Sequence, residues 1–96
     1  ESDMKARALV EARVDGDRML LATASALAAD GDLLSGADRA DIDALMAAVR
    51  SSLSLDDPAL IEAATQDLAK GTEAFAAMRM NRGIQKALAG KNIETV

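Results

Sequence analysis

The stretch SGADRADIDALMAAVRSSLSLDDPALIE, residues 35–62, holds one whole helix, a short loop and the start of another helix. Ser35 is a good N-cap for a helix over about 37–53, because its hydroxyl can accept a hydrogen bond from the first turn. Asp57 followed by Pro58 is a strong start signal for the next helix. Apolar residues at offsets of 3, 4, 7 and 11 predict one buried stripe on the first helix: Ile42, Leu45, Met46, Val49 and Leu53.

The segment before this stretch predicts a long helix over about residues 2–29. Leu20, Ala24 and Leu27 have the 4-then-3 spacing of one helical stripe. Gly31 stands where a left-handed residue would end the helix.

Gly16 lies in the middle of this long helix, between two aspartates. A glycine inside a helix costs about 1 kcal/mol relative to alanine, so it marks a weak point where the helix could bend. A plain surface glycine is the alternative interpretation.

The last helix is expected to begin at Asp57-Pro58, run past Gly71 and stop at Gly90. Its apolar stripe is expected to include Ile61, Ala64, Leu68, Phe75, Met78, Ile84 and Leu88.

Three helices joined by short loops predict an all-α fold, in which a long N-terminal helix projects from a small antiparallel three-helix bundle. A helix of about 28 residues is roughly 42 Å long, whereas one of about 17 residues is roughly 25 Å long and cannot cover it. We therefore expect one domain over 1–96, with about 1–18 projecting, 19–90 in the bundle and 91–96 frayed. The projecting part carries an apolar set that predicts an interface, unless the last helix folds over it: Met4, Leu9, Val10 and Val14.

The composition supports a helical fold and excludes several chemistries. Of 96 residues, 22 are alanine and one is aromatic, which opposes an all-β fold. The chain has no His and no Cys, so imidazole catalysis, thiolate chemistry and disulfides are excluded. The net charge is −5, with −6 over residues 1–58 and +1 over 59–96, which argues against nucleic-acid binding. No apolar run approaches the roughly 20 residues of a membrane span, and no secretory signal is visible.

The charged residues predict no catalytic, cofactor-binding or metal site. Asp30 and Asp32 faintly resemble part of a calcium loop, but Leu34 stands at the fifth position and no Glu at the twelfth. The isolated glycines form no phosphate loop. A basic strip late in the last helix is expected to be a solvated face: Arg79, Arg82 and Lys86.

Three stretches together resemble the C-terminal helical lid of an Hsp70 chaperone: VEARVDGDRML at 10–20, SGADRADI at 35–42 and DDPALIE at 56–62. The last third is most similar to the HscA type, which is specialised for iron–sulfur cluster assembly. That similarity is carried by FAAMRM at 75–80, KALAG at 86–90 and IETV at 93–96. The resemblance covers essentially the whole chain, and the chain begins Glu-Ser-Asp rather than Met, so we expect a fragment of a longer protein.

The resemblance implies a lid that closes over peptide held by a β-sandwich of the same chain and slows its release. It further implies a cytoplasmic parent protein that uses ATP and works with a client peptide, a J-protein co-chaperone and an iron–sulfur scaffold protein. Asp3 is the best match for the acidic residue that latches the family's lid to the sandwich. Gly16 would then be a hinge. The fragment itself is expected to be neither an enzyme nor a binder of cofactor, nucleic acid or membrane.

An independent three-helix protein-interaction or dimerisation module is the alternative function. The isolated chain is expected to self-associate through Met4, Leu9, Val10 and Val14, because their native cover is missing.

Overall fold

The computed structural model describes the backbone of residues 2–95 and the side chains of residues 4–89. These residues fold into four α-helices and one short 3-10 helix: α1 (Ser2–Asp30), η1 (Gly31–Leu33), α2 (Gly36–Ser52), α3 (Pro58–Gly71) and α4 (Glu73–Thr95). Within this part of the chain there is no strand. The predicted all-α class is confirmed.

Side-chain caps start α2 and α3 where the sequence predicts them. The Ser35 hydroxyl accepts a hydrogen bond from the Asp38 backbone N–H at 3.1 Å. The Asp57 carboxylate accepts one from the Ala59 N–H at 3.0 Å, and Pro58 occupies the first helical position. Each cap satisfies a donor that the helix itself leaves unpaired.

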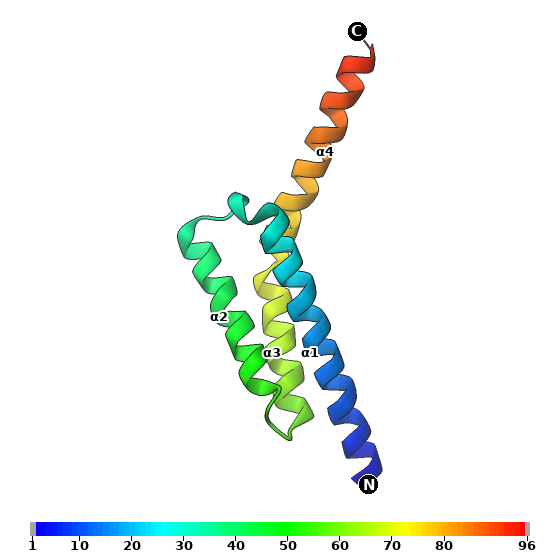
Figure 1. Ribbon diagram of the computed structural model, residues 1–96, viewed down its shortest axis with the longest axis vertical. Helices are drawn as coiled ribbons and strands as arrows, with labels where there is room; N and C mark the ends of the chain where they lie inside the picture. Colours follow the sequence, from blue (N-terminus) through cyan, green and yellow to red (C-terminus); the bar gives the residue numbers. More distant parts are fainter. Residues whose placement is uncertain (1, 96) are drawn as a thin grey trace.

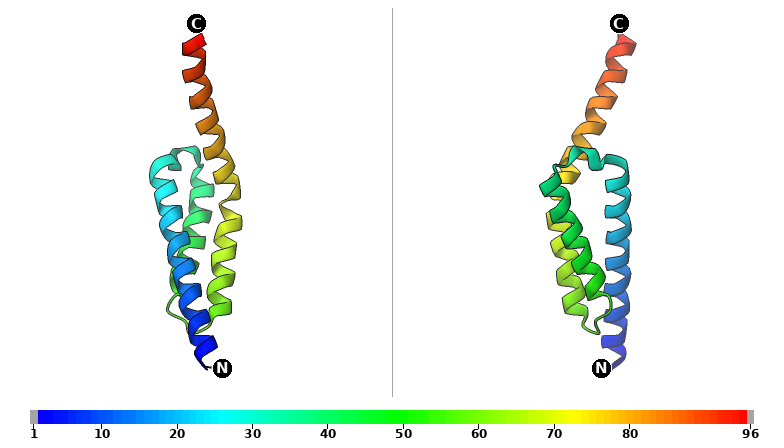
Figure 2. Two further views of the ribbon diagram at one scale, coloured as in Figure 1. Left: turned by 90° about the vertical axis from the view of Figure 1, so that its right-hand side faces the viewer. Right: turned by 60° about the vertical axis from the view of Figure 1, so that its left-hand side comes forward.

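The first three α-helices lie side by side, with α3 packed against both α1 and α2 (Figure 1). Helices α1 and α3 run in the same direction and α2 runs opposite to them (Figure 2). Helix α4 leaves the packed region at the end away from the N-terminus, so the molecule measures 65 × 28 × 17 Å.

The core lies where α3 meets its two neighbours. Val49, Ile61 and Leu68 are fully buried, and Phe75 at the start of α4 is 2% exposed. Seven residues form the main buried cluster: Ala26, Leu27, Ile42, Met46, Val49, Leu68 and Phe75. Most of them belong to the stripes that helical spacing predicts.

The last helix differs from the prediction because the chain breaks it at Thr72. Helix α3 ends at Gly71, and the Thr72 N–H still bonds to the carbonyl oxygens of the preceding turn before α4 begins at Glu73. Glycine is a poor helix former, which favours a break here. The predicted stripe is therefore not buried to its end: Ile84 and Leu88 are 51% and 52% exposed.

The boundaries of the projecting segment also differ from the prediction. Ala12 is 2% exposed and Gly16 is buried, so packing begins inside residues 1–18. The α2–α3 loop lies at the same end of the packed region, where Arg13 of α1 donates a hydrogen bond to the Leu53 carbonyl oxygen, while α4 extends from the opposite end (Figure 1). Helix α4 continues through Gly90 to Thr95, so the stop expected at Gly90 is wrong.

Gly31 does not adopt the left-handed conformation that we expected of a helix end. No residue in the described backbone has a positive φ. The chain instead tightens into η1, whose turn is closed by a hydrogen bond from the Leu34 N–H to the Gly31 carbonyl oxygen at 3.1 Å.

Candidate functional site

The N-terminal half of α1 exposes three large apolar side chains. Met4, Val10 and Val14 are 77%, 58% and 41% exposed. Leu9 is half-buried and lies on the same side of the helix as the buried Ala12. The structure thus leaves three of the four residues of the predicted interface on the open side of α1 and turns the fourth toward its neighbours.

Gly16 lies at a close approach of three helices, and α1 is unbroken through it. A Cβ atom added here would lie 3.1 Å from Leu53 Cδ2, 3.4 Å from Thr65 Oγ1 and 3.5 Å from Val49 Cγ1. The missing side chain therefore lets α2 and α3 approach α1 closely. The interpretation as a surface glycine is wrong, and the hinge role remains a prediction.

Arg13 fastens α1 to the loop between α2 and α3. Its Nε donates to the Leu53 carbonyl oxygen at 3.1 Å, and its Nη2 donates to the Leu55 carbonyl oxygen at 3.2 Å and to Asp56 Oδ1 at 3.0 Å. These bonds satisfy carbonyl groups beyond the end of α2 that have no helical partner. Sequence analysis missed this contact, because Arg13 and the loop are about 40 residues apart in the chain.

A cluster of four charged residues fastens α4 to the other end of α1. Arg79 Nε donates to Asp30 Oδ2 at 2.8 Å, and Arg82 Nη1 donates to Asp30 Oδ1 at 2.9 Å. Arg82 also holds both carboxylate oxygens of Asp32, at 2.9 and 2.6 Å. The Arg79 guanidinium lies 5.9 Å from the ring centroid of Phe75, within the range of a cation–π contact.

These bonds shift the ionisation of the groups that make them. Hydrogen bonds from Arg79 and Arg82 lower the pKa of Asp30 below its ordinary value of 3.8. A hydrogen bond from Arg82 lowers the pKa of Asp32 in the same way, and the two carboxylates raise the pKa of Arg82. The expectation that Arg79 and Arg82 form a solvated face is therefore wrong: they fix the start of α4 against η1.

The side chain of Asp3, the predicted latch residue, lies outside the described residues. The backbone places Asp3 at the N-terminal end of α1. The latch therefore stays a prediction.

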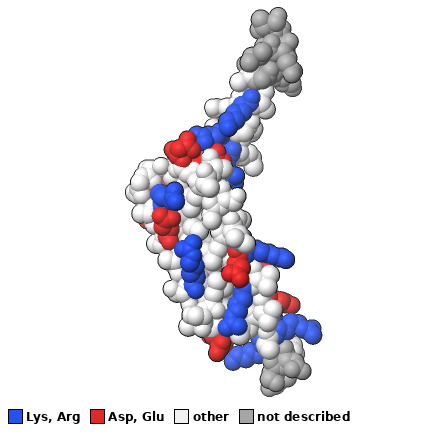
Figure 3. Space-filling model, viewed as in Figure 1, with Lys and Arg blue, Asp and Glu red and all other residues white. Residues whose placement is uncertain are grey.

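The described surface holds no group of three or more acidic residues that could bind a metal ion. Basic and acidic side chains alternate over the visible face and form no single patch (Figure 3). None of the described helices is long and apolar enough to cross a membrane.

An exposed apolar helix end on a small helical unit is typical of an element that packs against another protein surface.

Comparison with known proteins specifies the class further. No family model matches the chain. The whole chain is 66% identical over 96 residues to a protein of Delftia acidovorans (strain DSM 14801 / SPH-1) named "Chaperone protein HscA homolog". Proteins of the same name from Verminephrobacter eiseniae and Burkholderia multivorans are 65% and 52% identical over 94 and 96 residues, or 98% and 100% of this chain.

The chain is thus homologous to a segment of HscA-type chaperones, and the resemblance carried by its sequence stretches is confirmed. The match spans only 15% of the length of each of these three relatives. The comparison therefore identifies a chaperone segment and leaves its role to be proposed.

Proposed function

We propose that this chain is the helical lid of the substrate-binding part of an Hsp70-type chaperone, and that it acts in the maturation of iron–sulfur proteins. In this proposal α1, α2 and α3 form one antiparallel bundle, which closes over a peptide bound to the β-sandwich of the parent chain. ATP hydrolysis and the contacts with a J-protein and an iron–sulfur scaffold belong to the parent protein, and this segment has no catalytic role of its own.

The exposure of large apolar side chains at the N-terminal end of α1 is the single observation that carries the proposal. Met4 and Val10 are the most exposed large residues in the N-terminal half of α1, at 77% and 58%. Burying such side chains is favourable by about 25 cal/mol per Å² of apolar area. A β-sandwich docked at this end would supply that burial, while the rest of the chain would stand over the bound peptide.

A lid of this kind acts mainly on the rate of peptide release. Contacts between lid and sandwich must break before the peptide leaves, so their loss raises the off-rate with a smaller effect on the on-rate. The predicted latch at Asp3 would add a contact of the same kind, and bending at Gly16 would let the bundle swing while that contact holds.

Peptide release from the ADP-bound parent chaperone, with and without residues 1–96, tests the lid role. A fluorescent client peptide is chased with unlabelled peptide, and the loss of fluorescence anisotropy gives the off-rate. Much faster release without the segment supports a lid. Unchanged release would refute the lid and favour an independent interaction module.

A matched pair of substitutions on α1 tests the proposed docking face. Val10→Ser removes an apolar side chain from that face, whereas Leu21→Ser removes one that is 72% exposed further along the helix. We expect faster peptide release with Val10→Ser only. Equal effects of the two variants would mean that the N-terminal face is not the docking surface.

Self-association of the isolated chain is a second consequence of the same face. With their cover missing, Met4, Val10 and Val14 are expected to pair with those of a second copy. Sedimentation at two concentrations measures this, and a strict monomer at high concentration would contradict it.

A further inference from the structure

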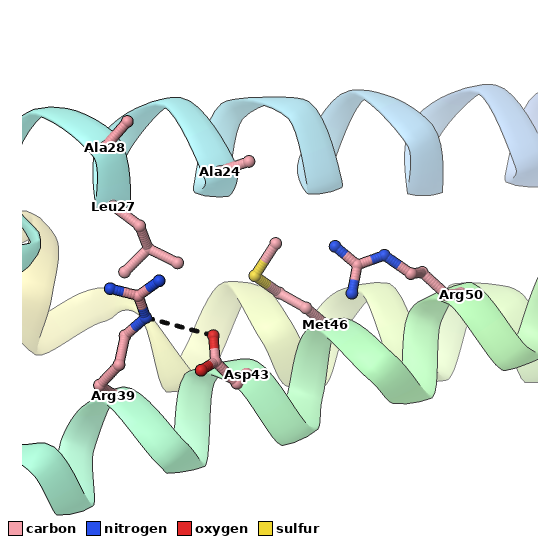
Figure 4. Close-up of a pocket in the computed structure, with 7 residues that line it drawn as sticks. All are labelled: Ala24, Leu27, Ala28, Arg39, Asp43, Met46 and Arg50. Atoms are coloured by element: carbon pink, nitrogen blue, oxygen red, sulfur yellow. Dashed lines mark hydrogen bonds and ion pairs between the residues drawn. The ribbon is translucent and has the colours of Figure 1, made fainter.

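A groove of about 340 Å³ lies between α1 and α2, well away from the N-terminal face of α1 (Figure 4). Its volume would hold on the order of ten water molecules at about 30 Å³ each. Leu27 of α1 and Met46 of α2 form its floor, and both are nearly buried, at 7% and 4% exposure.

Small side chains explain why the groove is open. Ala24 and Ala28 lie one turn apart on the side of α1 that borders the groove, and each contributes only a methyl group. Helix α3 packs closely against both α1 and α2, whereas α1 and α2 contact each other much less. The space between them is therefore not filled by the core.

Two arginines of α2 give the groove its charge. The guanidinium groups of Arg39 and Arg50 both lie in the space between the helices, on either side of Met46 (Figure 4). The residues are 11 positions apart, so their Cα atoms are about 16 Å apart along the helix. An extended or helical segment laid along the groove could contact both of them.

Most N–H donors of the Arg39 and Arg50 side chains make no hydrogen bond within the part of the chain that the structure describes. Arg39 donates only its Nε, to Asp43 Oδ1 at 3.3 Å in a pair whose side chains are 47% and 55% exposed. Arg50 makes no ion pair with any side chain of residues 4–89. A guanidinium offers five N–H donors in a planar fork that matches a carboxylate.

We propose that this groove binds an acidic segment of another protein, in which carboxylates flank an apolar side chain. The lining holds two arginines and one aspartate, so the groove is locally positive, although the whole chain has a net charge of −5. Carboxylates would pair with the arginines, and an apolar side chain would lie against the exposed methyl groups of Ala24 and Ala28, above the nearly buried Leu27 and Met46. The floor favours such a peptide over a free anion, and the absence of an aromatic residue from the lining gives nucleic-acid bases nothing to stack on.

This surface is separate from the proposed docking face of the lid. A segment bound between α1 and α2 would leave Met4 and Val10 uncovered, so the inference does not depend on the lid role. The groove is shallow and its arginines are exposed, so each arginine–carboxylate pair should change the affinity about two- to fivefold. We expect weak binding that weakens further as salt is raised.

A nuclear magnetic resonance titration of the isotope-labelled 96-residue chain tests the proposal. The probe is the capped peptide acetyl-Glu-Glu-Leu-Leu-Glu-Glu-amide, and the control peptide carries Gln in place of every Glu. The expected result is a shift of the Arg50 Nε–H signal and of backbone amides that line the groove, with the acidic peptide only. Equal shifts with the neutral peptide, or none at millimolar acidic peptide, would overturn the proposal.

Matched charge removals locate the binding site. Arg50→Gln removes a groove arginine, whereas Arg18→Gln removes an exposed arginine of α1 that does not line the groove. Neither residue makes an ion pair in the described structure, so both variants should fold. Arg50→Gln should weaken peptide binding about two- to fivefold and Arg18→Gln should leave it unchanged. Equal weakening by the two variants would show nonspecific charge attraction and overturn the proposal.

Discussion

Two leucines of α3 provide a direct test of the core. Leu68 is fully buried and Leu60 is 51% exposed. Replacing either by alanine removes the same atoms from the same helix with the same small change in helix propensity. The two variants therefore differ only in how completely the leucine is packed.

The buried position should dominate the outcome. Leu68→Ala loses the transfer free energy of the side chain and leaves a cavity, which together cost about 3 kcal/mol. Leu60→Ala is expected to cost less than about 0.5 kcal/mol. A domain of this size has a total unfolding free energy of about 5–15 kcal/mol, so the first loss is a large fraction of it.

Urea unfolding followed by far-ultraviolet circular dichroism measures the difference. With a slope near 1.5 kcal/mol per molar urea, Leu68→Ala should lower the midpoint by about 2 M and Leu60→Ala should barely move it. If Leu68→Ala does not fold, Leu68→Met keeps the volume and should cost less than about 1.5 kcal/mol. Equal midpoint shifts for the two alanine variants would refute the packing of α3 between α1 and α2.

The charge cluster at the start of α4 should lose its effect in acid. The folded pKa of Asp30 is lowered, so its stabilising contribution is present above the ordinary value of 3.8 and is lost as pH falls through the lower folded value. In thermal melts at decreasing pH, the melting temperature of Asp30→Asn should fall less than that of the unchanged chain. Parallel plots of melting temperature against pH for the two chains would contradict this. Gly16→Val should lower the unfolding free energy by about 1–3 kcal/mol, because the added side chain overpacks the site. Gly83→Val should not, because no atom lies within 4 Å of a Cβ at Gly83. Equal urea midpoints for the two variants would refute the close packing of α2 and α3 against Gly16. Arg13→Gln should cost about 1 kcal/mol in the same assay through its lost hydrogen bonds, with Arg18→Gln as a control that should be neutral.

Local signals made the helix starts predictable. Ser35 and the Asp57-Pro58 pair act on backbone groups within three residues, so their effect is the same whatever the rest of the chain does. The buried stripes could be predicted for a similar reason, because helical spacing alone places Ile42 and Met46 on one face.

Long-range contacts could not be predicted from the same spacing. Asp30 and Arg82 are 52 residues apart, and only the turn at η1 and the break at Thr72 bring them together. Opposite charges near the ends of two predicted helices were the available signal, and it does not distinguish an ion pair from two solvated groups. Gly16 shows the same limit, because its burial depends on where α2 and α3 cross α1.

The elongated shape of the chain makes it a lever. Helix α1 and helix α4 leave the packed region at opposite ends, so a rotation about the N-terminal end of α1 is amplified along the 65 Å length to the far end of α4. How faithfully the motion is transmitted depends on the joint at Asp30, Asp32, Arg79 and Arg82. Arg79 and Asp32 are 41% and 66% exposed, whereas Arg82 and Asp30 are only 28% and 17% exposed. Salt screens exposed pairs more than partly buried ones, so a higher ionic strength should loosen that joint only in part and change how far the tip of α4 follows the movement of α1.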